Sequence, residues 1–308
     1  MARFILNVGP TVFQHCLPTH ESQEKTMASV EQKVEQKKTR PLAVVTGASS
    51  GIGYELARQF VHNGFDVLIA AEDDGITEAA RTLAGSGRVE SVKVDLARYE
   101  GVEFLYAKIQ ALGRPVDAIA INAGVGVGGD FARQTRLEDE LNLISLNVTS
   151  AVHLAKRVSK DMVQRRSGRI LFTSSIAAVM PAPFEAVYGA SKAFLQSFSE
   201  ALRNELSDVG ITVTALMPGP TETNFFHRAG MDDTRVGQQQ KDDAGEVARQ
   251  GFEALMAGKD KVVAGSLKNR VMDGGRRPSD SGSGHGPTAP AAHRAGFREE
   301  EQVAAFHR

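Results

Sequence analysis

The amino-acid sequence predicts an α/β protein with a doubly wound parallel sheet of seven strands and helices on both faces of the sheet. From residue 41 to about residue 272, short apolar runs alternate with longer amphipathic stretches, which is the pattern of repeated strand–helix units. The first apolar run leads into a glycine-rich turn and then directly into an amphipathic stretch, as expected where the first strand of such a sheet meets its first helix.

The predicted strands are the short apolar runs. They lie at residues 42–45, 66–70, 89–94, 118–121, 169–173, 212–216 and 261–264. Amphipathic stretches between them predict helices, and these include residues 53–63, 99–112, 147–165 and 188–206. Gly64 and Gly113 follow the first two of these helices, at the position where glycine commonly ends a helix.

Both ends of the chain lack this periodicity. Residues 1–40 predict a disordered or weakly helical leader, since residues 24–40 are almost all polar or charged. Residues 273–308, rich in Gly, Ser, Pro and Arg, predict a flexible tail. One domain, residues 41–272, therefore holds the whole sheet.

Composition excludes several classes of protein. With 36 Lys plus Arg against 37 Asp plus Glu, the net charge of -1 offers no footprint for nucleic acid or an anionic membrane. Cys16 is the one cysteine, so an intrachain disulfide is impossible, and no apolar run is long enough to cross a bilayer. The eight histidines and Cys16 show no HExxH or CxxC spacing, so no metal is expected. We expect a cytoplasmic protein with no nucleic-acid or membrane partner.

The glycine-rich turn is a candidate phosphate site. Glycines at a strand-to-helix turn let the backbone approach a pyrophosphate, and the following helix presents unpaired N–H groups and its positive dipole end. A glycine turn without a ligand is the structural alternative. The predicted contacts are Thr46, Gly47, Ser49, Ser50, Gly51, Ile52 and Gly53.

This turn has the form TGxxxGxG, and here the sequence resembles the short-chain dehydrogenase/reductase family. The resemblance implies a Rossmann-type fold that binds NAD or NADP. Asn122-Ala123-Gly124 is similar to the family's NNAG motif and implies a segment that supports the central sheet and flanks the adenosine ribose. Asp95-Leu96 matches the position that receives the adenine amino group, although an Asp that caps the following helix would look the same.

The predicted catalytic residues are Asn147, Ser175, Tyr188 and Lys192. Tyr188 is the one tyrosine with a lysine four residues later, and this separation places the phenol and the ammonium on one face of a helix. Ser175 lies at the family's spacing before Tyr188, which Ser174 fits less well. Asn147 matches the family's helix asparagine, and a polar residue of this kind disturbs a helix locally.

Their roles follow from acid–base chemistry and from the resemblance. A free tyrosine titrates near pH 10, so a nearby cation must favour its phenolate, and Lys192 is placed to do so. The resemblance implies that Tyr188 gives or takes the substrate proton and that Ser175 holds the substrate oxygen. It also implies that Lys192 binds the nicotinamide ribose and that the Asn147 backbone holds a relay water. The resemblance implies, finally, that the hydride passes to or from the nicotinamide.

A proline-glycine turn follows the sixth predicted strand and resembles the family's PG motif, whose backbone and threonine receive the nicotinamide carboxamide. An ordinary Pro-Gly turn would look the same. The predicted contacts are Pro218, Gly219, Thr221 and Thr223.

Residues 224 to about 241 then lie where the family carries a mobile substrate lid. Phe225, Phe226 and Met231 either face an apolar substrate or pack within the lid, and the sequence favours neither.

The second strand ends in Ala71, Glu72, Asp73 and Asp74. Family members that use NADP often carry arginine at the positions of Ala71 or Glu72, or a basic residue in the glycine turn, and neither is present here. We predict that Glu72 contacts the coenzyme and that NAD is favoured over NADP, because carboxylates repel a 2′-phosphate.

The matches follow the family order over residues 41–272 and predict an NAD(P)-dependent oxidoreductase that interconverts a small-molecule alcohol and a carbonyl. One alternative is a non-catalytic dinucleotide-binding sensor or scaffold, which would be expected to have lost Tyr188 or Lys192. A less favoured one is an epimerase or dehydratase, which usually has a TGxxGxxG turn and a larger C-terminal domain. Relatives commonly pair through the two long helices, here 147–165 and 188–206, so we expect a homodimer or homotetramer.

Overall fold

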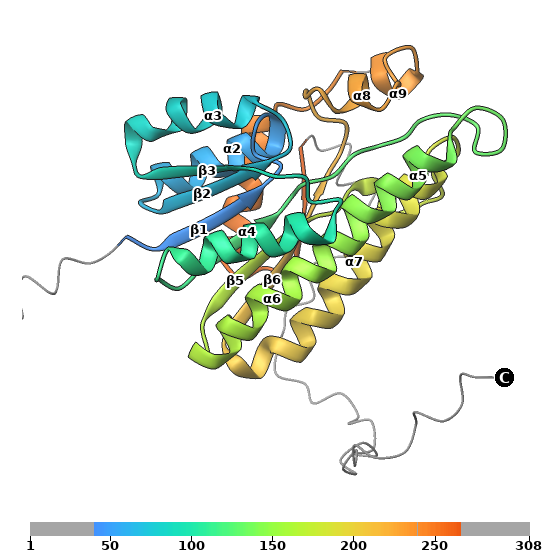
Figure 1. Cartoon of the computed structure of the whole chain (residues 1–308). Coiled ribbons are helices and arrows are strands. Elements are labelled where there is room, and N and C mark those ends of the chain that lie inside the picture. The colour runs from blue at the N-terminus through green and yellow to red at the C-terminus, as the bar shows by residue number, and fades with distance from the viewer. Residues whose placement is uncertain (1–39, 239, 266–308) are drawn as a thin grey trace, which may run out of the picture. The chain divides into compact units, whose positions relative to one another are not determined.

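Seven parallel strands form one twisted sheet in the computed structural model, which describes residues 40–238 and 240–265 (Figure 1). The strand order is β3-β2-β1-β4-β5-β6-β7, with every neighbouring pair parallel. The strands are β1 Leu42–Thr46, β2 Asp66–Ala71, β3 Val89–Lys93, β4 Ala118–Ile121, β5 Gly168–Thr173, β6 Ile211–Pro218 and β7 Lys261–Ala264. The predicted doubly wound sheet of seven strands is confirmed.

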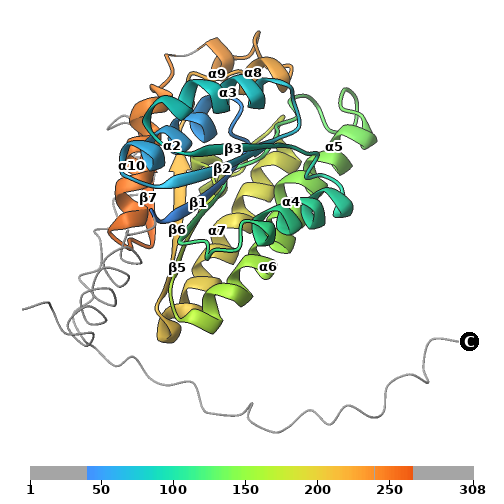
Figure 2. The same cartoon turned by 60° about the vertical axis from the view of Figure 1, so that its left-hand side comes forward.

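Helices cover both faces of the sheet (Figures 1 and 2). One face packs against α2 Gly51–His62, α3 Gly75–Leu83 and α10 Ala244–Met256, and the other against α4 Tyr99–Ala111, α6 Ser150–Arg165 and α7 Ala186–Leu206. Successive residues of a strand point to opposite faces, so Val44 packs with the second set of helices and Val45 with the first. Because both faces are covered, the central strands are continuous apolar runs rather than alternating ones.

Several shorter elements complete the described part of the chain. They are the helices α5 Leu137–Ile144, α8 Phe225–Arg228 and α9 Arg235–Gln238, a π-helical turn Ser145–Thr149, and three 3₁₀ turns at Ala84–Ser86, Ile176–Val179 and Ser207–Val209. The π-helical turn joins α5 to α6, so the helix predicted from residue 147 is part of a longer helical stretch with a local widening at Asn147.

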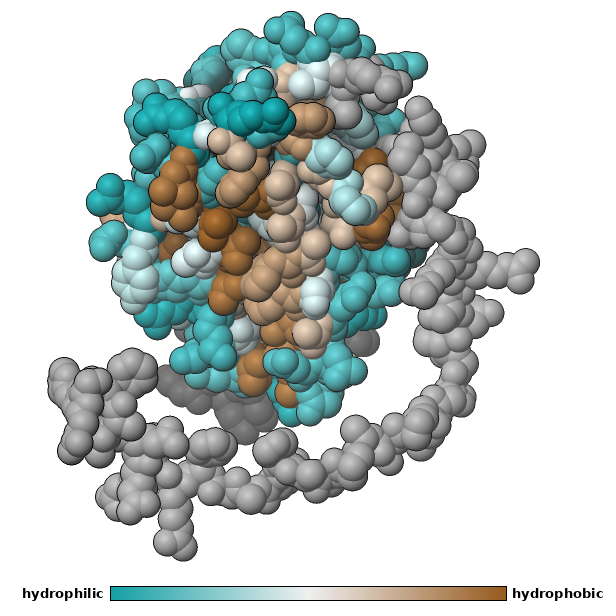
Figure 3. Space-filling view, turned by 90° about the vertical axis from the view of Figure 1, so that its right-hand side faces the viewer, coloured by the Kyte–Doolittle hydropathy of each residue, from teal (hydrophilic) through white to brown (hydrophobic). Residues whose placement is uncertain are grey.

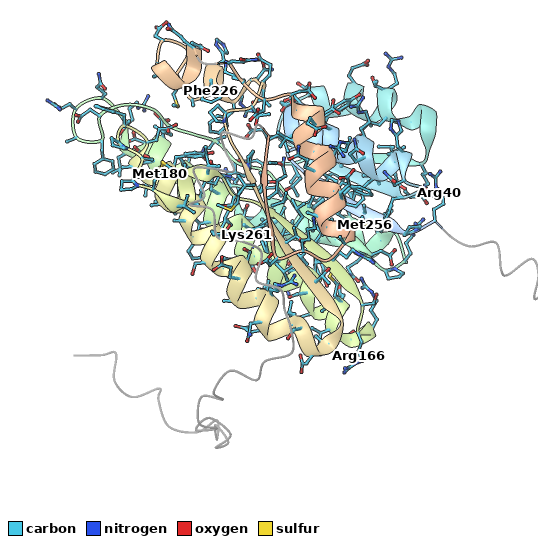
Figure 4. All side chains as sticks on the ribbon, turned by 180° about the vertical axis from the view of Figure 1, so that it is seen from behind. Arg40, Arg166, Met180, Phe226, Met256 and Lys261 are labelled. Atoms are coloured by element: carbon cyan, nitrogen blue, oxygen red, sulfur yellow. The ribbon has the colours of Figure 1, made fainter. Side chains whose placement is uncertain are left out.

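The strand order reverses between β1 and β4, which both lie beside each other at the centre of the sheet. Ligands of doubly wound sheets bind at the carboxyl ends of the strands beside such a reversal. In Figure 4, the label of Phe226 in α8 lies near this carboxyl end of the strands. Arg166, which precedes β5, marks the opposite end of the sheet.

The predicted leader and tail lie outside the described residues, apart from Arg40. Arg40 contacts the domain, since its Nε donates to the carbonyl oxygen of Gly64 at 3.0 Å. No helix in the described part of the chain is both long and apolar enough to pass through a bilayer.

Apolar side chains gather on the face of the molecule where α5 and α7 lie (Figure 3). Leu137, Leu141 and Ile144 of α5 and Phe194 of α7 are exposed there. Leu137, Leu141 and Ile144 recur at the spacing of one helix face, so this apolar surface is a regular feature of α5.

Candidate active site

A cavity of about 220 Å³ opens at the carboxyl ends of the central strands. Segments that are far apart in sequence meet in its wall: the glycine turn, the ends of β2 and β4, the first turn of α7 and the turn after β6. The predicted residues that line it are Gly47, Ser49, Ser50, Gly51, Ile52, Gly53, Glu72, Leu96, Asn122, Ala123, Gly124, Tyr188, Lys192, Pro218, Gly219, Thr221 and Thr223. Thr46, Asp95, Asn147 and Ser175 lie outside this lining.

The glycine turn is shaped by steric limits on its backbone. Gly47 has φ of 66°, in the left-handed region that favours glycine. A Cβ on Gly53 would lie 2.1 Å from the carbonyl oxygen of Gly47, a distance at which no side chain fits. Ser50 precedes α2 without capping it through its side chain, so N–H groups of the first turn are left for a ligand in the cavity.

Thr46 and Asn122 lock the turn to the sheet from below. Thr46 Oγ1 accepts the backbone N–H groups of Asn122 and Ala123, both at 3.0 Å. Asn122 Nδ2 donates to the carbonyl oxygen of Thr46 at 3.0 Å, and Thr173 Oγ1 donates to Asn122 Oδ1 at 3.0 Å. Thr46 is almost fully buried, so it supports the turn from behind the wall of the cavity.

Asp95 lies before α4 but does not cap it, because the N-terminal cap of this helix is Arg98. Its Oδ1 accepts the backbone N–H of Ala97 at 2.9 Å, just before α4 begins. A contact of Asp95 with the adenine amino group stays a prediction. Leu96, its neighbour, is buried and lines the cavity.

Tyr188 and Lys192 line the cavity, and Ser175 lies beside Tyr188 outside the lining. Lys192 Nζ lies 5.6 Å from the centre of the Tyr188 ring and donates to the carbonyl oxygen of Thr173 at 2.8 Å. Ser175 shares a side-chain hydrogen bond with Tyr188. Ser174 also lines the cavity, but its Oγ donates to the Lys192 carbonyl oxygen at 2.9 Å and is thereby used to hold α7.

The acid–base properties of this group are set by burial. Burial lowers the pKa of Lys192 to about 8. Burial also raises the pKa of Tyr188 above its ordinary value, the hydrogen bond with Ser175 acts against this rise, and the charge of Glu185 adds to it. We expected the Lys192 charge to favour the phenolate, but the largest influence on Tyr188 acts in the opposite direction. Tyr188 is therefore a neutral proton donor at pH 7.

Asn147 sits in the π-helical turn and ties the segment after β4 to α7. Its Oδ1 accepts the N–H of Val125 at 2.9 Å, and its Nδ2 donates to the Val125 carbonyl oxygen at 2.9 Å and to Ser191 Oγ at 3.0 Å. A Cβ on Gly124 would lie 3.0 Å from Asn147 Oδ1 and 3.4 Å from Lys192 Nζ. Glycine at this position therefore lets both side chains approach the backbone.

The sequence left two roles open for the apolar residues of the lid, facing a substrate or packing within the lid, and the structure contains both. Phe225 lines the cavity, and its ring centre lies 5.2 Å from that of Tyr188. Phe226 also lines the cavity, yet it is mostly buried in a small apolar cluster with Ala229 and Met231. Met231 is thus a packing residue of the lid.

Three residues of the site were missed by sequence reasoning. Thr173 receives Lys192 and fixes Asn122, Glu185 lines the cavity one turn before Tyr188, and Arg228 lines it from the lid. The spacing of Glu185 from Tyr188 could have indicated it, whereas no pattern in the irregular lid singles out Arg228. In the described part of the chain, no group of three or more His, Cys, Asp or Glu side chains could hold a metal ion.

The sequence profile described as short chain dehydrogenase matches residues 41–233. The chain belongs to the short-chain dehydrogenase/reductase family. This dehydrogenase is 32% identical over 200 residues to the NADP-dependent 3-hydroxy acid dehydrogenase YdfG of Salmonella typhimurium, covering 64% of this chain and 80% of that protein. Membership of the family makes it an NAD(P)-dependent oxidoreductase.

Solved structures of similar proteins have the same fold. The short-chain dehydrogenase from Sphingobium yanoikuyae in complex with NADPH is 29% identical, with a TM-score of 0.68 over 81% of this chain and 98% of that one. The fold also matches that of a short-chain dehydrogenase/reductase from Burkholderia phymatum in complex with NAD, 24% identical, with a TM-score of 0.65 over 73% of this chain and 88% of that one. The Rossmann-type fold expected from the resemblance is confirmed.

Proposed function

We propose that this dehydrogenase interconverts a small-molecule alcohol and a carbonyl, with Tyr188 as the proton donor and acceptor. The observation that carries the proposal is that Tyr188 and Lys192 line the same cavity as the glycine turn, while Ser175, outside the lining, shares a hydrogen bond with Tyr188. A substrate and a dinucleotide can therefore share one cavity.

The cavity fits a nicotinamide dinucleotide. Gly53 and Gly47 leave a backbone cradle that a Cβ would fill, and the first turn of α2 offers N–H groups to a pyrophosphate. Toward the nicotinamide end, Thr221 is held by its Oγ1, which donates to the Gly219 carbonyl oxygen at 2.9 Å, and Lys192 is available to bind a ribose. When bound, the nicotinamide supplies the hydride for reduction and accepts it in oxidation.

The residues of the chain supply the proton and the orientation. In reduction, the neutral Tyr188 phenol donates its proton to the carbonyl oxygen of the substrate as that oxygen gains negative charge. The Ser175 hydroxyl donates a hydrogen bond to the same oxygen and keeps it beside Tyr188. The Lys192 ammonium, near both the ring and the ribose site, stabilises the phenolate that remains. Oxidation of the alcohol reverses these steps.

Asn147 supports this proton transfer through position. Its side chain is used entirely by Val125 and Ser191, and the π-helical turn changes the backbone pairing around it. We infer that the backbone of Asn147 holds a water of the proton relay to Lys192.

We also propose that NAD is preferred over NADP. Glu72 and Asp73 both line the cavity at the end of β2, and neither this strand end nor the glycine turn contributes a basic side chain to it. Carboxylates accept hydrogen bonds from ribose hydroxyls and repel a 2′-phosphate, and a difference of 1.4 kcal/mol already means a tenfold preference. Titration of nicotinamide fluorescence tests this, and tighter binding of NADPH than of NADH would contradict it.

The exposed apolar face of α5 and α7 supports assembly into a homodimer or homotetramer. We propose separately that the enzyme is cytoplasmic and that residues 41–272 form its folded domain. Sedimentation of the purified full chain measures the mass in solution, and a monomer at all concentrations would contradict the proposed assembly.

The activity is tested with a panel of ketones and secondary alcohols, following the absorbance of the reduced nicotinamide. The proposal expects turnover of at least one compound and loss of that turnover in Tyr188→Phe. Tight dinucleotide binding without turnover across a broad panel would instead support a sensor or scaffold.

A further inference from the structure

An ion pair joins the lid to the end of β2 across the cavity. Arg228, the last residue of α8, donates through Nη2 to Glu72 Oε1, and both residues line the cavity. Among the described residues, nothing donates to the second carboxylate oxygen of Glu72. The pair is half-exposed, so each partner is open to exchange with a ligand that enters the cavity.

Arg228 is the one cation that faces this end of the cavity among the described residues. The basic residues that line the cavity are Lys192 and Arg228, and Lys192 is fixed at the other end by Thr173 and Tyr188. Lys93 of β3 lies opposite Ala71, at the end of β2, in the register of the sheet. It forms a 2.5 Å ion pair with Asp74, however, and does not line the cavity.

The two other carboxylates of the strand end have partners of their own. Asp73 accepts Ser49 Oγ at 2.7 Å and the N–H of Gly75 at 3.0 Å, so it is tied to the glycine turn and to the start of α3. Asp74 is held by Lys93. Of the three carboxylates at the end of β2, Glu72 is therefore the one that pairs with Arg228.

Packing within the lid holds Arg228 in this place. Phe226, Ala229 and Met231 form one apolar cluster around α8, whose position is seen at Phe226 in Figure 4. The carbonyl oxygen of Ala229 accepts the N–H of Gly128 at 3.2 Å, which joins the lid to the segment after β4. The guanidinium thus projects from a packed unit toward the strand end.

We propose that Arg228 is a lid-borne binding site for the 2′-phosphate of NADP. The inference rests on the proposed binding of a nicotinamide dinucleotide at this cavity. With NAD, the free oxygen of Glu72 accepts a ribose hydroxyl while Arg228 keeps the other oxygen. With NADP, the phosphate dianion takes the guanidinium from Glu72, because Arg pairs with phosphate through charge-assisted hydrogen bonds. Glu72 sets the preference for NAD, and Arg228 keeps that preference small enough for NADP to bind.

The test compares NADPH and NADH binding by fluorescence titration in the full chain. Arg228→Met keeps the apolar stem and removes the charge, so the Kd for NADPH should rise at least about tenfold and that for NADH less than about threefold. Arg228→Lys should give an NADPH affinity between the two. Glu72→Gln should lower the Kd for NADPH relative to that for NADH. Added salt should weaken NADPH binding more in the wild type than in Arg228→Met.

His227→Ala is the matched control, since His227 is in α8 but exposed and outside the cavity lining, and it should change neither Kd. Equal losses of both coenzymes in Arg228→Met would mean that the lid only covers the site and would overturn the inference. No change in either Kd would overturn it as well. If the wild-type protein binds neither coenzyme, the proposed function itself is contradicted. If it binds both and Arg228→Met has no selective effect, only this inference is contradicted.

Discussion

The glycine turn and the lid line the same cavity, yet they are built differently. Side chains that are buried or partly buried, among them Thr46, Asn122 and Thr173, fix the turn through a continuous set of hydrogen bonds. The lid has two helices of one turn each, one small apolar cluster and an ion pair to Glu72. The part that all dinucleotides share therefore faces a backbone that these hydrogen bonds fix. The parts that differ between ligands face side chains of the lid.

The largest expected effect on coenzyme affinity lies in the glycine turn. Gly53→Val would place a side chain 2.1 Å from the Gly47 carbonyl oxygen, so the turn must shift and coenzyme Kd should rise by about a hundredfold or more. Gly85→Ala is the control, because a Cβ at Gly85 meets nothing within 4 Å. Retained coenzyme affinity in Gly53→Val would show that the turn is not rigid.

The next prediction distinguishes the two neighbouring serines, of which Ser175 acts in catalysis and Ser174 supports the structure. Ser175→Ala removes the hydroxyl beside Tyr188, so kcat should fall by about a hundredfold to a thousandfold with little change in coenzyme Kd. Ser174→Ala removes the hydrogen bond to the Lys192 carbonyl oxygen and should lower the free energy of unfolding by about 1 kcal/mol with a milder loss of rate. Steady-state rates and urea unfolding measure the two effects, and reversed roles would contradict the assignment.

A pH titration sharpens the account of Lys192. Reduction that needs the ammonium should slow as pH rises through about 8, where the buried Lys192 loses its proton. Its pKa is lowered from 10.5, so between about pH 8 and 10.5 the unfolded chain binds more protons than the folded one. The Lys192 contribution to the free energy of unfolding therefore rises with pH in that window while the rate falls. Two results would contradict the assignment of these pH dependences to Lys192. One is a rate and a free energy of unfolding that both fall near pH 8, and the other is the same pH dependence in Lys192→Met.

The smallest effect is expected in the lid. Phe225→Ala removes the ring beside Tyr188, so KM for an apolar substrate should rise by about tenfold while coenzyme Kd changes by less than about threefold. Phe131→Ala, at an exposed phenylalanine outside the cavity lining, is the matched control. A larger effect on coenzyme than on substrate would move Phe225 from the substrate end to the dinucleotide.

The same contrast explains how much could be predicted from sequence. The strands and the glycine turn were predictable because apolar periodicity and glycine spacing follow directly from burial and backbone geometry, and β4 and β7 begin and end as expected. Helices α3, α5 and α10 were not assigned, and the predicted helix at 147–165 proved to follow a π-helical turn that includes Asn147.

Properties that depend on three-dimensional proximity could not be predicted. The ion pair of Glu72 and Arg228 joins residues from distant parts of the chain, and nothing in either local sequence indicates it. Burial, which sequence does not measure at a single residue, also determines the direction of the Tyr188 pKa shift, against the expectation based on Lys192 alone.

The most direct measurement is the turnover of Tyr188→Phe together with its coenzyme Kd. The substitution removes one hydroxyl and keeps the ring that contacts Phe225, so the fold and the glycine turn are unaffected. The account predicts that kcat falls by about a hundredfold to ten-thousandfold, the usual contribution of positioned acid–base catalysis, while the coenzyme Kd stays within about threefold of the wild type. A Tyr188→Phe enzyme that keeps its full rate would contradict the assignment of Tyr188 as the proton donor.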